Sequence, residues 1–134
     1  MKELAEQSEI VMWVRRAGGP WTGRPIWVVV TGGEAYVRAA FGARSAWYRV
    51  VRGGAQAAIQ VGGEVFPARL EAVGDPELID RVSGCYRAKY ALSWPGPVES
   101  IVAPEIAVTT MRLRVETSSQ AETASQVEIP ELPA

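Results

Sequence analysis

The chain has 134 residues, with 14 basic and 15 acidic side chains, no histidine and one cysteine. Its length and its hydrophobic content of 48% suit one globular domain with a real core, and they exclude a wholly disordered chain. Without histidine there is no serine–histidine–aspartate triad and no histidine-ligated metal, and Cys85 alone makes neither an internal disulfide nor a cysteine-rich zinc site.

Three strands are predicted in the first forty residues. Residues 10–16 are apolar, β-branched and aromatic, and residues 25–30 form a short apolar run bounded by turn residues, which is typical of a buried strand. The glycine pair within 31–34 predicts a tight hairpin, because glycine adopts positive φ readily, and 35–40 is then the returning strand. Alternation along that strand places its even-numbered residues, Arg38 among them, on one face.

A short helix and a second hairpin follow. Ser45 is placed to cap a helix over 46–52, which the next glycine pair ends. Strands are predicted over 57–61 and 64–73, joined by another glycine pair. These residues therefore continue an antiparallel pattern with tight connections.

One long helix is the clearest element of the chain. Asp75 is a strong helix cap, Pro76 suits the first helical position, and apolar residues recur at helical spacing as far as Tyr90. The segment 91–104 contains several prolines and is predicted to be a loop, and 106–115 is predicted to be the last strand.

Together these elements favour a mainly β fold of about six strands, a small antiparallel barrel or sandwich with one long helix. We expect one domain over residues 1–115, followed by an acidic, disordered tail over 116–134, where serine, threonine, glutamate and proline dominate. No apolar run approaches the roughly 18 residues of a membrane span, and no apolar stretch of the signal-peptide kind follows Lys2. We therefore expect a cytoplasmic protein without a membrane partner.

Charge is unevenly distributed along the chain. Residues 116–134 hold four glutamates and no base, so residues 1–115 carry 14 basic and 11 acidic side chains. The acid-free stretch between Glu34 and Glu64 contains Arg38, Arg44, Arg49 and Arg52. Clustered guanidinium groups predict a phosphate or carboxylate site, and the alternative is a solvated surface on which arginine covers apolar neighbours. A nucleic-acid partner is not expected, because the chain is almost neutral.

Several short stretches, taken in order, resemble a known superfamily. They are 23–29, 36–38, 42–49 (Gly-Ala-Arg-Ser-Ala-Trp-Tyr-Arg), 61–63 and the Lys89-Tyr90 pair at the end of the long helix. Their order and spacing resemble the split β-barrel proteins that include pyridoxamine-phosphate oxidase and the flavin- and deazaflavin-dependent oxidoreductases, and within them a branch of small uncharacterised proteins. No single stretch is a sharp catalytic signature.

The resemblance implies a six-stranded split β-barrel that forms a homodimer with two cofactor sites at the subunit interface. By the matching motifs, Arg38 on the third strand and Arg44 and Ser45 in the loop after it would hold the cofactor phosphate. Trp47, Tyr48 and Arg49 would follow at the short helix. Trp27 would lie beside the cofactor ring. The cofactor would be FMN or a deazaflavin coenzyme, and no catalytic residue is assigned.

Three functions remain open at this point. The resemblance implies a nitroreductase-like oxidoreductase that transfers hydride from a flavin or deazaflavin to a small unsaturated or nitro-type molecule. The second is a cofactor-free barrel, a binding module or a shape-template enzyme, with a small-molecule ligand in the same pocket. Val50 favours it, because deazaflavin-binding relatives carry an asparagine there. The third is a non-catalytic dimeric structural protein.

Overall fold

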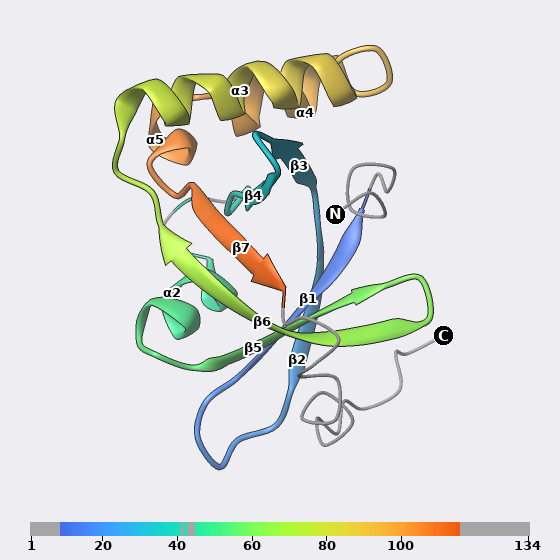
Figure 1. Ribbon diagram of the computed structural model, residues 1–134, viewed down its shortest axis with the longest axis vertical. Coiled ribbons are helices and arrows are strands. Elements are labelled where there is room, and N and C mark those ends of the chain that lie inside the picture. The colour runs from blue at the N-terminus through green and yellow to red at the C-terminus, as the bar shows by residue number, and fades with distance from the viewer. Residues whose placement is uncertain (1–8, 41, 43–44, 116–134) are drawn as a thin grey trace.

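The computed structural model describes residues 9–40, 42 and 45–115 (Figure 1). In chain order its strands and helices are β1 (Ile10–Arg15), β2 (Thr22–Ile26), β3 (Val28–Thr31), β4 (Glu34–Val37), α2 (Ala46–Arg52), β5 (Gln56–Val61), β6 (Glu64–Ala72), α3 (Pro76–Tyr90), α4 (Pro95–Ile101), α5 (Pro104–Ala107) and β7 (Met111–Val115). The predicted Arg44 site and the predicted acidic tail lie outside the described residues. None of the helices in the described part is long and apolar enough to cross a membrane.

The strands form one curled antiparallel sheet in the order β2-β1-β5-β6-β7-β4-β3. Its two outermost strands, β2 and β3, are consecutive in the chain and separated only by Trp27. Ile26 pairs with the start of β1, whereas Val28 pairs with the end of β4. The chain therefore changes partners at Trp27, which leaves a seam in the wall of a split β-barrel.

The seam explains the difference between seven observed strands and about six predicted ones. The predicted strand over 25–30 spans the end of β2, Trp27 and most of β3. Apolar content marks a buried extended segment, but it does not show which neighbours the segment pairs with. The fold class itself, mainly β and antiparallel with one long helix, is confirmed.

The two larger of the three apolar clusters in the described residues lie on opposite sides of the sheet. The interior cluster includes Val28, Ala35 and Val37, and the Trp47 and Tyr48 side chains of α2 pack into it. The second cluster lies outside the barrel, where Tyr36 meets buried residues of α3, α4 and α5. The alternation predicted for β4 is thus confirmed, because Tyr36 faces away from its neighbours.

The long helix α3 begins where the sequence predicts. Asp75 is its N-cap, and the Asp75 carboxylate accepts a hydrogen bond of 3.1 Å from the backbone N–H of Glu77. Pro76 occupies the first turn, in which a missing N–H leaves no helical bond unmade. Figure 1 shows α3 lying across one end of the barrel together with α4 and α5.

Two predictions about the region after α3 are wrong. The expected loop over 91–104 contains α4, and the expected strand over 106–115 begins only at Met111, because α5 occupies its start. Each of these short helices has a proline in its first turn, so the residues taken as helix breakers are helix starters here. Thr109 then donates from its hydroxyl to the Ile106 carbonyl at 2.6 Å, within the turn that leads into β7.

Candidate functional site

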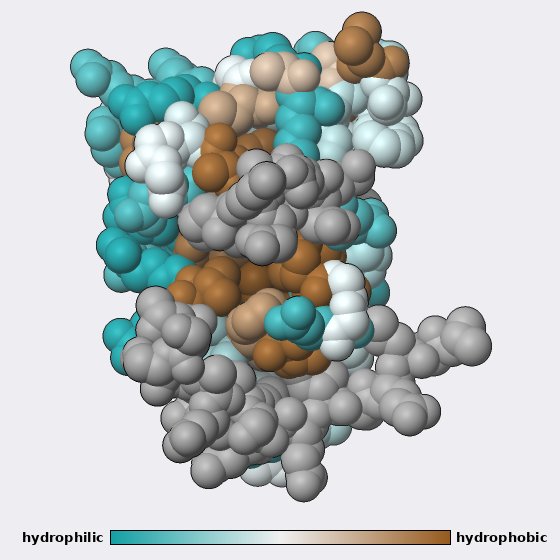
Figure 2. All heavy atoms as spheres, turned by 45° about the vertical axis from the view of Figure 1, so that its right-hand side comes forward, coloured by the Kyte–Doolittle hydropathy of each residue, from teal (hydrophilic) through white to brown (hydrophobic). Residues whose placement is uncertain are grey.

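A cavity of about 770 Å³ opens at the barrel seam, between the start of β1, the β2–β3 junction, the end of β4 and helix α4. The residues that line it are Glu9, Arg24, Pro25, Ile26, Trp27, Arg38, Ala40, Ser45, Trp47, Pro97, Ser100 and Ile101. Figure 2 brings the right-hand side of Figure 1 forward and shows apolar surface below the helical layer, whose own surface is mixed in hydropathy. The volume of the cavity lies within the range of about 300–1,000 Å³ that small-molecule sites occupy.

Arg38 is the most unusual residue of the cavity wall. It follows β4 directly, and alternation places its side chain on the outer side of the barrel, beneath α3 and α4. Its Nε donates to the Thr110 hydroxyl at 2.8 Å. Its two terminal nitrogens donate to the carbonyls of Ile101 at 3.0 Å and Ile79 at 2.8 Å. The guanidinium is therefore held by three segments that are remote from it in sequence.

The positive charge of Arg38 is buried without a carboxylate partner among the described residues. The residue is 1% exposed, and its guanidinium lies 5.3 Å from the centre of the Tyr86 ring. Burial lowers the pKa of Arg38, and Tyr86 and Asp80 act in the opposite direction. All three hydrogen-bond acceptors are neutral, so the guanidinium forms no ion pair with a carboxylate of the described residues at the wall of the cavity.

Trp27 forms a flat apolar wall that is supported from behind. Its ring stacks on that of Tyr90 with 4.1 Å between centroids and 4° between planes. The Tyr90 hydroxyl accepts from the Val28 N–H at 3.2 Å and donates to the Val28 carbonyl at 3.0 Å. Lys89 donates to the same carbonyl at 2.7 Å. The Lys89-Tyr90 pair named in the sequence thus fixes the backbone next to Trp27.

Burial shifts the pKa values of both members of this pair. It raises the pKa of Tyr90 to about 12, although the hydrogen bond to Val28 opposes the shift. It lowers the pKa of Lys89. In each case burial disfavours the charged form of the side chain.

The structure brings four of the seven predicted site residues together. Trp27, Arg38, Ser45 and Trp47 line the cavity. The Ser45 hydroxyl oxygen is buried, it has no hydrogen-bond partner among the residues that the structure describes, and it makes no cap bond to α2. Leaving a buried hydroxyl without a hydrogen bond costs free energy, so a ligand group that forms this bond would bind more tightly.

The remaining predicted site residues are elsewhere. Tyr48 is buried in the interior cluster, edge-on to Trp47 with 6.0 Å between ring centroids, and its hydroxyl accepts from Arg52 at 3.0 Å. Arg49 is exposed on α2 and does not line the cavity. Arg44 lies outside the described residues.

Sequence reasoning missed two charged residues of the cavity, Arg24 and Glu9. Arg24 belongs to the stretch 23–29 that carries the resemblance, and Glu9 immediately precedes the first predicted strand. Only the pairing of β1 with β2 brings both to the seam, so no local pattern could have assigned them. Within residues 9–40, 42 and 45–115, no group of three or more histidine, cysteine, aspartate or glutamate side chains could hold a metal ion.

Comparisons with known proteins agree with this architecture. Residues 1–113 match a protein family described as "Uncharacterized protein conserved in bacteria (DUF2255)". No curated protein matches the sequence.

Solved structures of the same fold include proteins whose names give different ligands or substrates. The heme storage protein HutZ from Vibrio cholerae is 14% identical with a TM-score of 0.64, over 87% of each chain. An F420-H2-dependent reductase is 17% identical with a TM-score of 0.59, over 82% of this chain and 95% of its own. A putative pyridoxamine 5'-phosphate oxidase from Listeria innocua is 11% identical with a TM-score of 0.55, over 86% and 87%. At these identities the likeness shows the fold alone, which is the split β-barrel.

Proposed function

The chain belongs to the family of uncharacterized proteins conserved in bacteria named DUF2255, and from the seam cavity we propose that it binds a flavin or deazaflavin cofactor through an anionic group. With that cofactor it acts as an oxidoreductase on a small unsaturated or nitro-type molecule. The cofactor supplies hydride transfer when bound. The protein supplies binding, orientation and exclusion of water.

Arg38 is the observation that carries the proposal. A buried cation without an ion-pair partner is costly, so the Arg38 guanidinium, which pairs with no carboxylate of the described residues, favours a negatively charged ligand at the cavity wall. Three of the five N–H groups of Arg38 donate hydrogen bonds to protein acceptors, and these bonds orient the guanidinium group before a ligand arrives. Arg24 adds a second positive charge at the same cavity.

The apolar part of the cavity suits a planar ring system. Trp27 and Trp47 both line it, and Pro25 and Ile26 continue the apolar wall. Because Tyr90 stacks on one face of Trp27, that indole is held as a rigid surface, and rigid aromatic walls favour flat conjugated ligands. The same-fold reductase and oxidase named above support this class of ligand.

The first test is binding of FMN, of the deazaflavin coenzyme and of riboflavin, which has the FMN ring without its phosphate. We expect quenching of tryptophan fluorescence that saturates with FMN or with the deazaflavin, and a weaker affinity for riboflavin. No saturable quenching by any of the three would remove the proposal.

Arg24 provides the matched variant pair. Arg24→Gln is expected to weaken FMN binding about tenfold, about 1.4 kcal/mol, because one charge-assisted contact to the phosphate is lost. Riboflavin affinity should not change. Arg81→Gln removes an exposed arginine of α3 that does not line the cavity and should leave both dissociation constants at the wild-type value. Equal losses in the two variants would mean that general charge, not a phosphate contact, governs binding.

We also propose that the protein is a homodimer, as the resemblance implies. Sedimentation equilibrium on the full chain measures this directly. A monomer at all concentrations would contradict it.

A cofactor-free small-molecule-binding barrel is the second candidate, and Val50 favours it. This residue takes the place of an asparagine in deazaflavin-binding relatives. A valine side chain has no polar atom to offer a cofactor, and here it packs against the interior cluster. Native mass spectrometry of freshly purified protein separates the two candidates. A bound non-flavin molecule would support the second, whereas a bound flavin would exclude it.

A further inference from the structure

Charge is segregated more sharply than the net charge suggests. Residues 10–63 contain seven arginines and a single acid, Glu34, whereas residues 116–134 contain four glutamates and no base. The one acid of the first segment already forms an ion pair, because Glu34 Oε2 lies 3.5 Å from Arg112 Nε. The basic segment and the acidic segment are therefore complementary in charge.

Two neighbouring residues of the basic segment carry buried N–H donors that have no acceptor in the described part of the chain. Trp21 is 9% exposed, and its indole N–H has no hydrogen-bond partner within residues 9–40, 42 and 45–115. The same holds for the buried Nε of Arg15. The Arg15 guanidinium lies 5.5 Å from the centre of the Trp21 ring, so the two donors are neighbours. Trp13 provides the contrast, because its indole N–H donates to Gln60 at 3.0 Å. A buried N–H without an acceptor costs free energy, which an arriving carboxylate would recover.

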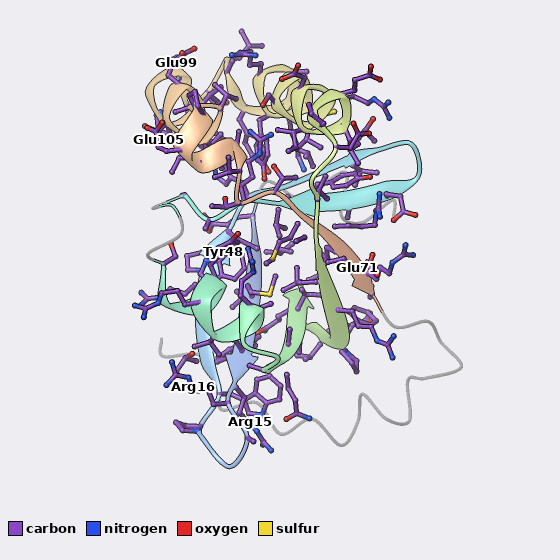
Figure 3. All side chains as sticks on the ribbon, turned by 90° about the vertical axis from the view of Figure 1, so that its left-hand side faces the viewer. Arg15, Arg16, Tyr48, Glu71, Glu99 and Glu105 are labelled. Atoms are coloured by element: carbon purple, nitrogen blue, oxygen red, sulfur yellow. The ribbon has the colours of Figure 1, made fainter. Side chains whose placement is uncertain are left out.

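We call Arg15, Arg16 and Trp21 the basal face. Figure 3 shows Arg15 and Arg16 at the end of the barrel opposite to Glu99 and Glu105 on the helical layer. An apolar cluster of Trp13, Trp21 and Ala58 adjoins them. The basal face thus combines positive charge and unmet donors with a buried apolar cluster, against which the partly buried Val11 and Val65 pack.

The C-terminal segment leaves the sheet close to the basal face. Val115, the last residue of β7, pairs with Ala68 of β6. Ala68 pairs with Ala57 of β5, and Ala57 pairs with Val14 of β1. Val14 precedes Arg15 and is three strand spacings from Val115, or about 14 Å. The 19 residues that follow Val115 can span about 60 Å when extended, so the basal face is well within their reach.

We propose that residues 116–134 bind back onto the basal face of their own barrel. One carboxylate of the segment accepts hydrogen bonds from Arg15 Nε and the Trp21 indole N–H, and Arg16 adds charge attraction. Near the end of the chain Val127, Ile129 and Leu132 alternate with Glu128 and Glu131, which provides apolar contacts for the adjoining cluster along with the carboxylates. The proposal is independent of any cofactor.

The test compares two full-length variants with the same change in net charge. In the tail variant Glu122, Glu128 and Glu131 are replaced by glutamine. In the control Glu77, Glu99 and Glu105 are replaced by glutamine; all three are exposed on helices. The readouts are the ¹⁵N–¹H signals of the tryptophan indoles and the arginine Nε groups. Trp21→Phe identifies the Trp21 signal, and the Trp13 indole serves as an internal reference.

The proposal predicts that the Trp21 and Arg15 signals shift in the tail variant and in 1 M salt, and stay in place in the control. It also predicts that the heteronuclear NOE of backbone amides in 116–134 is high in the wild type and falls in the tail variant. Unchanged Trp21 and Arg15 signals in the tail variant would overturn it, as would equal shifts in the control. Shifts that grow with protein concentration would also overturn it, because they would place the tail on a second copy.

Discussion

Arg38 has a structural role as well as the proposed ligand contact. Its sequence context allowed a phosphate ligand or a solvated side chain on a half-exposed strand, and the solvated alternative is wrong because the residue is 1% exposed. Its hydrogen bonds connect β4 to α3, to α4 and to the turn before β7. Arg49 and Arg52, by contrast, are exposed, as the alternative describes.

Arg38→Met is expected to lower the free energy of unfolding by about 2–4 kcal/mol, because the buried Thr110 and Ile101 and the half-buried Ile79 lose a charged donor. Urea denaturation followed by circular dichroism measures this. Arg49→Met, at an exposed position, should change stability by no more than about 0.5 kcal/mol. Similar stabilities for the two variants would show that the three bonds of Arg38 contribute little.

Tyr90 makes the free energy of unfolding depend on pH in the alkaline range. Its pKa is raised to about 12 by burial, whereas tyrosine in an unfolded chain ionises near pH 10. Between these values the unfolded chain has lost a proton that the folded chain keeps, so stability is full below pH 10 and falls as the pH rises toward 12. Tyr90→Phe should show a shallower fall than the wild type in urea denaturation at pH 9, 10 and 11. Parallel curves for the two proteins would contradict this.

At the scale of the element, the starts of α2 and α3 differ although both have a residue type that caps helices. Asp75 accepts a hydrogen bond from Glu77, whereas Ser45 forms no cap bond and its hydroxyl is buried beside the cavity. The sequence predicts both helix starts, but it does not show that only one of the two side chains makes the bond.

Asp75→Ala should therefore lower the free energy of unfolding by about 1 kcal/mol, the usual value of a lost N-cap. Ser45→Ala should not lower it, because the buried hydroxyl that is removed makes no hydrogen bond to any residue that the structure describes. Thermal and urea denaturation of both variants measure the difference. A loss in Ser45→Ala as large as that in Asp75→Ala would show that the Ser45 hydroxyl has a partner in solution.

At the scale of the whole molecule, the cavity exists because the barrel is split. The seam at Trp27 separates the partners of β2 from those of β3, and α4 and the residues after β4 complete the wall. A ligand in this place would contact segments from most of the chain, so its binding should stabilise the fold as one unit.

FMN at a free concentration one hundred times its dissociation constant should raise the free energy of unfolding by about 2.7 kcal/mol. Thermal denaturation monitored at increasing FMN should show a midpoint that rises steadily with ligand. Riboflavin at the same concentration should raise the midpoint less, because it lacks the phosphate. A midpoint that does not respond to either ligand would contradict binding in the native state.

The sequence by itself determined the fold class, the hairpins and the start of α3, because periodicity, glycine pairs and a capping aspartate act over a few residues. It also singled out Trp27, Arg38, Ser45 and Trp47, through the order of motifs that resembles split β-barrels. Only the tertiary structure decided that these four side chains share a cavity with Arg24, since strand pairing joins residues far apart in the chain. The burial of Arg38 was likewise decided there, because its hydrogen-bond acceptors lie between 41 and 72 residues away in sequence.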